Sequence, residues 1–203
     1  MNNFLRDHPF WGLASPLTSL TGAGLMVIAS GRVASALICA AALVWVYCFT
    51  VFAGKLGGAW FPRRGRDLTL LFLSALAAGL FMILLWVFDP VLSLESAFFI
   101  FLVPVVCTAS GIYGRAADDD ILEALSQALT EALVSGVLLL ALALVREPLG
   151  YGSLSLPGLG LVRFFREEPL RIFQAASGAL ILLGYGTALY RYFRNRETNS
   201  EDE

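Results

Sequence analysis

The sequence is poor in charged residues. They make up 15% of the 203 residues, whereas a soluble globular domain has about 25%. Hydrophobic residues make up 58%, which is more apolar surface than one core of this size can bury. The chain therefore needs a second apolar solvent. We predict an all-α integral membrane protein in a lipid bilayer.

Cysteine and histidine are also scarce. The chain has 3 Cys and 1 His, so a disulfide scaffold is excluded and zinc-ligand spacings do not occur. The histidine, His8, has no catalytic pairing in the sequence, and neither a nucleophile elbow nor a phosphate loop is present. The net charge of −2 gives no reason to expect nucleic acid as a partner. We predict neither catalytic residues nor a metal site.

Six apolar stretches are long enough to cross a bilayer. About 20 residues are needed to cover ~30 Å of hydrocarbon, and the candidates are 10–31, 33–54, 68–88, 97–114, 121–145 and 170–192. We predict one six-span domain over 1–194, followed by a short charged tail over 195–203. No removable signal peptide is expected, because the first stretch contains Pro16 and has no cationic segment before an Ala-x-Ala site.

Basic residues are divided unequally between the two faces of such a protein. With six spans, both termini lie on one face, which holds nine Lys and Arg residues against five on the other. The positive-inside rule then places both termini, and the charged tail, in the cytoplasm.

The first and fourth stretches share a pattern in which small and hydroxyl residues surround a proline. The strings are GLASPLTSLTG at 12–22 and PVVCTASG at 104–111. Pro16 and Pro104 each remove a backbone donor, so we expect both helices to be broken where they are buried in protein. Stretches three apart run in opposite directions, which predicts two inverted three-helix repeats, 1–90 and 95–194. Alternatively, the prolines only kink ordinary helices.

Four segments in chain order resemble the small six-span subunits of the Rnf and Nqr ion-translocating electron-transport complexes. They are HPFWGLASPL at 8–17, FLVPVVCTASGIYGRA at 101–116, the polar start of the fifth stretch, and VREPLGYGSL at 145–154, which is similar to the family's x-R-E-x-x-G-x-G-x-L. The cytoplasmic N-terminus matches the Rnf E or Nqr D type. The resemblance implies a bacterial inner-membrane protein that works with a paired membrane subunit of opposite topology and with other electron-transport subunits.

The resemblance also implies a [2Fe–2S] cluster, held by one cysteine from the first and one from the fourth helix of each paired subunit. The aligned positions here are Ser15 and Ser110. Serine is a poor iron ligand compared with a thiolate, so we expect the cluster to be absent. Cys107 lies one helical turn before Ser110, although packing is the ordinary role of a free cysteine in an apolar helix.

Polar side chains follow one face of the fifth stretch. Glu123, Gln127 and Glu131 recur every four residues, and such groups do not all face lipid. One interpretation is an ion pathway, a polar cytoplasmic vestibule that attracts cations. The other is that Glu123 lies among headgroups and complements the helix dipole. Glu131 would lie ~15 Å inside a helix that begins at Ile121 and would need a partner or a proton.

Arg146 and Glu147 close the fifth stretch and are followed by Pro148 and Gly150. Ordinary helix capping is the favoured interpretation of this pair. Our first hypothesis is a membrane subunit, not catalytic by itself, that helps couple electron transfer to cation movement. The second is a cluster-free relative that acts as a transporter or assembly protein on the same scaffold.

The topology can be tested with reporter fusions. A reporter fused after Arg196 should be active in the cytoplasm, and one inserted in the 152–160 connection should be active on the opposite side. Measured activity of paired cytoplasmic and periplasmic reporters checks this. Both sites reporting from the same side would contradict the six-span assignment.

Overall fold

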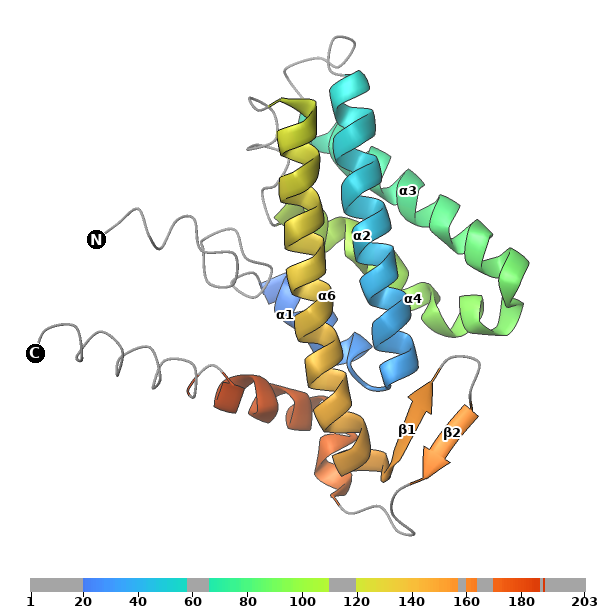
Figure 1. Ribbon diagram of the computed structural model, residues 1–203, viewed down its shortest axis with the longest axis vertical. Helices are drawn as coiled ribbons and strands as arrows, with labels where there is room; N and C mark the ends of the chain where they lie inside the picture. The colour runs from blue at the N-terminus through green and yellow to red at the C-terminus, as the bar shows by residue number, and fades with distance from the viewer. Residues whose placement is uncertain are drawn as a thin grey trace, which may run out of the picture.

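The computed structural model describes residues 20–57, 66–109, 120–156, 160–163, 170–186 and 188. These residues are mostly helical (Figure 1). In chain order the elements are α1 (Leu20–Ala29), α2 (Val33–Leu56), α3 (Arg66–Phe88), α4 (Pro90–Ala109), α6 (Ile121–Tyr151), β1 (Ser153–Leu156), β2 (Gly160–Arg163), the short 3-10 helix η1 (Arg171–Phe173) and an apolar helix, Ala176–Gly186.

Four helices of the described part, α2, α3, α4 and α6, are long and apolar enough to cross a membrane. This is the architecture of an all-α membrane protein, and the prediction is confirmed at that level. The first and sixth predicted spans, 10–31 and 170–192, lie only partly within the described residues. The described parts of these spans are the 10 residues of α1 and the helix Ala176–Gly186. The presence of six membrane spans therefore stays a prediction.

The helices α2 and α6 form the centre of the molecule. They lie side by side and run in opposite directions (Figure 1). The buried face of α6 repeats small residues every four positions, at Ala124, Ala128, Ala132 and Gly136. A Cβ added at Gly136 would lie 3.1 Å from the Cβ of Ala40 on α2. The two backbones therefore approach closely, as helices in membranes do where small residues meet.

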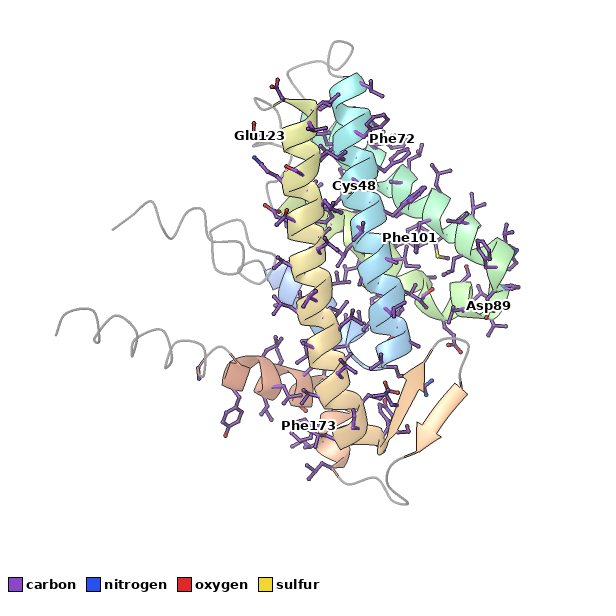
Figure 2. All side chains as sticks on the ribbon, viewed as in Figure 1. Cys48, Phe72, Asp89, Phe101, Glu123 and Phe173 are labelled. Atoms are coloured by element: carbon purple, nitrogen blue, oxygen red, sulfur yellow. The ribbon has the colours of Figure 1, made fainter. Side chains whose placement is uncertain are left out.

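A hairpin of α3 and α4 packs against α2, with its corner at Asp89 (Figure 2). The indole N–H of Trp45 on α2 donates to the carbonyl of Ala77 on α3 at 3.2 Å. Asp89 Oδ1 accepts from the backbone N–H groups of Val91 and Leu92 at 3.0 and 3.1 Å.

Our expected start of the fourth span, near residue 97, is therefore wrong. Asp89 and Pro90 end α3 and begin α4 at once, because aspartate is a good N-cap and proline at the first helical position has no N–H to leave unsatisfied.

The fourth helix continues through Pro104 as far as Ala109. The expected break therefore does not occur at Pro104. The proline has no N–H, so the helix lacks one backbone hydrogen bond at this position. Its carbonyl accepts the hydroxyl of Thr108 at 3.2 Å. Residues 110–119, with Ser110, lie outside the described residues, and a break after Ala109 stays a prediction.

The first helix, α1, packs against α4. Its Leu25 and Met26 are buried in the same core cluster as Val103 and Cys107 of α4. The helix that follows the first proline-containing segment is therefore a neighbour of the helix that contains Pro104. Ser15 and Pro16, where we expect the first helix to be broken, lie outside the described residues.

The fifth predicted span is longer than expected. We predicted an end at Val145, but α6 runs through Pro148 to Tyr151. It ends at Gly152, whose φ of 65° and N–H bond to the Pro148 carbonyl at 3.0 Å form a left-handed C-cap. The antiparallel hairpin β1–β2 follows. The sequence analysis missed this hairpin, since four alternating residues are too short a signal.

Large apolar side chains cover the outer faces of α3 and α4. Phe72 on α3 and Phe101 on α4 are 71% and 54% exposed, and both are labelled in Figure 2. Phe88, at the end of α3, is 80% exposed. Faces of this kind suit lipid rather than water.

Substitution of Gly136 tests the close approach of α2 and α6. Gly136→Val should lower the stability by about 1–3 kcal/mol, because the new methyl groups would overlap Ala40. The control is Gly79→Val on α3, where nothing lies within 4 Å of an added Cβ. Thermal unfolding in mild detergent, followed by circular dichroism, measures both. Equal midpoints for the two variants would contradict the close packing.

Candidate functional site

Two adjacent charged residues of α6 are buried. Arg146 is 4% exposed and Glu147 is 1% exposed. They lie toward the end of α6 that is marked by Phe173 in Figure 2, and Glu123 marks the other end. A buried charge is costly unless polar groups satisfy it. The partners of this pair therefore show what it does.

All five N–H groups of the Arg146 guanidinium donate hydrogen bonds. Nε donates to the Phe173 carbonyl (2.8 Å), Nη1 to the Val27 carbonyl (2.6 Å) and Ser30 Oγ (2.9 Å), and Nη2 to the carbonyls of Gln174 (3.0 Å) and Ala175 (3.2 Å). Arg146 thus joins the end of α1 to the segment that precedes the helix Ala176–Gly186. A cation at the C-terminal end of α1 also complements the dipole of that helix.

Glu147 accepts backbone hydrogen bonds from two other segments. Oε2 accepts the N–H of Val33, the first residue of α2, and Oε1 accepts the N–H of Ser155 in β1, both at 2.7 Å. The N-cap residue of α2, Arg32, makes no side-chain capping bond. The N-terminus of α2 is therefore capped by a carboxylate from another helix, which also complements the helix dipole.

Smaller contacts surround this pair. Ser155 Oγ accepts the N–H of Ala34 at 3.4 Å, and the Arg32 guanidinium lies 5.8 Å from the centre of the Tyr151 ring. We call Arg146, Glu147 and their hydrogen-bond partners the Arg146–Glu147 junction. The junction binds both ends of the turn between α1 and α2: Arg146 binds the end of α1, and Glu147 binds the start of α2.

The structure corrects one detail of the capping interpretation. Arg146 and Glu147 cap α1 and α2, whereas the end of their own helix is capped by Gly152. Gly150 is also part of the junction, since a Cβ there would lie 3.2 Å from the backbone nitrogen of Gln174. Arg146, Glu147, Gly150 and Gly152 of the segment 145–154 thus each have a structural role.

The sequence analysis missed the partners of the junction. Ser30 and Val33 showed no local signal, because their bonds to the junction span 116 and 114 positions. A buried charge in an apolar helix predicts that partners exist, and it does not predict which residues they are.

The three ion-pathway candidates lie at the start of α6. Glu123 is exposed, whereas Gln127 and Glu131 are half-buried. The hydroxyls of Ser126 and Thr130 lie between them in sequence and donate to backbone carbonyls of their own helix at 2.8 Å. This end of α6 is polar, and ion movement along it stays a prediction.

The thiols fit poorly to a shared iron–sulfur cluster. Cys107 is fully buried in the apolar core, and Ser15 and Ser110 lie outside the described residues. Cys39 is buried on α2 and Cys48 is half-buried. Over the described ranges, no three His, Cys, Asp or Glu side chains are grouped to hold a metal ion. The absence of a [2Fe–2S] cluster, expected from Ser15 and Ser110, stays a prediction.

No protein-family model matches this chain, and no curated protein matches it by sequence. The assignment of the site therefore depends on the residues and geometry described above.

Removal of the Glu147 carboxylate tests the junction. Glu147→Ala should lower the stability by about 2–5 kcal/mol, because two backbone N–H groups would be buried without an acceptor. The control, Glu123→Ala, changes an exposed carboxylate of the same helix and should cost less than about 0.5 kcal/mol. Urea unfolding in detergent, followed by tryptophan fluorescence, measures both. A Glu147→Ala protein as stable as Glu123→Ala would refute the capping role.

Proposed function

We propose that the chain is a membrane subunit of an Rnf/Nqr-like ion-translocating electron-transport complex. The observation that carries this proposal is the segment 145–154, which is similar to the family's x-R-E-x-x-G-x-G-x-L. Arg146 and Glu147 join four segments, Gly150 permits a close backbone approach, and Gly152 has a left-handed conformation. Residues with such specific tasks form a pattern that seldom arises by chance, which supports the resemblance.

The packing of the helices supports the inverted-repeat part of the proposal. In two inverted three-helix repeats, the first helix corresponds to the fourth and the second to the fifth. Here α1 packs against α4, and α2 packs antiparallel to α6 (Figure 1). Two of the three pairs of corresponding helices are therefore in contact, as expected if a two-fold axis in the membrane plane runs between them.

In this role the subunit is not catalytic by itself. It pairs with a membrane subunit of opposite topology in the bacterial inner membrane, and both of its termini are cytoplasmic. Glu123, Gln127 and Glu131 line the cation path at the start of α6, since they are the carboxylate and amide groups on one face of that helix.

A second function is favoured by the serines at the cluster positions. Ser15 and Ser110 replace the thiols that an electron-carrying subunit of this type would use, and Cys107 is committed to the apolar core. In this alternative the chain keeps the scaffold as a transporter or assembly protein, without redox work.

Purification from the native membrane tests the first proposal. The full chain, tagged at its C-terminus and extracted in mild detergent, should retain a second six-span subunit together with flavin-containing or ferredoxin-like subunits. Mass spectrometry identifies them, and an unrelated tagged membrane protein is the control. Recovery of the chain without redox subunits would favour the transporter or assembly alternative.

Analysis of the same complex tests the cofactor. Acid-labile sulfide and electron paramagnetic resonance after reduction should show no [2Fe–2S] signal that depends on this subunit, because serine is a poor iron ligand. A signal abolished by Cys107→Ala would overturn this prediction. Ser15→Cys combined with Ser110→Cys should be the most direct way to create such a signal.

A further inference from the structure

The two charged residues of the junction bind different parts of the chain. Arg146 binds the end of α1 and residues 173–175, whereas Glu147 binds the start of α2 and β1. None of these bonds connects both side chains to one segment. Adjacent positions on a helix point about 100° apart, and this divergence separates the two sets of partners.

The helix bound by Arg146 is the less secured of the two. The described residues of α1 pack mainly against α4, with smaller contacts to α6 and α2, and Arg146 donates hydrogen bonds to Val27 and Ser30 at the end of this helix. The 24-residue α2, by contrast, packs along α6, α3 and α4. Loss of its cap would disturb its first turns and leave the long contact with α6 in place.

We propose that Arg146 and Glu147 are two separate latches, so that α1 is an independently movable element of the bundle. Arg146 fixes α1 on α4, and Glu147 fixes the start of α2 and the hairpin. Release of the first latch loosens α1 from α4 while α2 and α6 stay packed. Arg146 is thus a positioning residue for the contact between α1 and α4.

Three native thiols report on these elements separately. Cys107 lies on α4 in the core cluster with Leu25 and Met26 of α1, and Cys39 lies near the capped end of α2. Both are fully buried, and the half-buried Cys48 serves as an internal reference. The rate of labelling by N-ethylmaleimide in mild detergent, measured for each cysteine by mass spectrometry, follows the opening of each region.

The expected result is a crossed pattern. Arg146→Gln should raise the labelling rate of Cys107 by about fivefold or more and leave that of Cys39 unchanged, since even one lost hydrogen bond has about this effect. Glu147→Gln should raise the rate for Cys39 and leave Cys107 unchanged. Arg146→Lys keeps the charge with fewer donors and should give an intermediate rate for Cys107.

Other patterns overturn the proposal. If Cys39 and Cys107 become reactive together in either variant, the junction is one unit. If Arg146→Gln leaves Cys107 protected, Arg146 does not hold α1. Should Arg146→Gln or Glu147→Gln fail to accumulate, the milder Ser30→Ala and Ser155→Ala variants decide. Ser30→Ala removes one acceptor of Arg146. Ser155→Ala removes the hydroxyl that accepts the Ala34 N–H at the start of α2, beside the bonds of Glu147. Unchanged labelling of Cys107 in Ser30→Ala would then refute the role of Arg146.

Discussion

The burial of two opposite charges on one turn of a helix organises this end of the molecule. A guanidinium and a carboxylate that are removed from water need many hydrogen bonds, and only the polar ends of other elements supply enough of them. Arg146 meets carbonyl groups at the end of α1, and Glu147 meets an N–H group at the start of α2. The same hydrogen bonds therefore satisfy the buried charges and the unpaired backbone groups at the two helix ends.

This arrangement explains why the chain changes direction where it does. At the turn between α1 and α2, the end of α1 leaves backbone carbonyls unpaired and the start of α2 leaves N–H groups unpaired. The N-cap residue Arg32 makes no side-chain capping bond. A residue pair from α6 provides one group of each kind. Because α6 also packs along α2 through small residues, the junction sits where the two backbones are already close. The end of α1 and the start of α2 are therefore both bound by side chains of one helix, α6.

Sequence reasoning located the long apolar helices well and failed at their polar ends. The start of α2 at Val33 and the end of α3 at Phe88 agree with the predicted spans, because charged or turn residues follow or precede long apolar runs there. The start of α4 was wrong because Asp89 and Pro90 were interpreted only as a stop. The end of α6 was wrong because the charged pair Arg146 and Glu147 was taken to close the apolar span, whereas the helix continues to Tyr151. In both cases tertiary hydrogen bonds or capping decided the boundary. The partners of Arg146 could not be predicted, since nothing local marks a carbonyl that a distant guanidinium will bind.

The length of α6 bears on the depth of its polar residues. Its 31 residues span ~46 Å at 1.5 Å per residue, whereas the hydrocarbon is ~30 Å thick. The helix therefore extends beyond the hydrocarbon, and depth cannot be counted from its first residue. The run 132–145 contains no charged residue, and a hydrocarbon slab centred on this run leaves Glu131 and Arg146 within ~5 Å of its two borders. At that depth a carboxylate such as that of Glu131 is less costly than at the bilayer centre. The same placement puts the Arg146–Glu147 junction at the opposite border, where α1, α2 and the hairpin all begin or end.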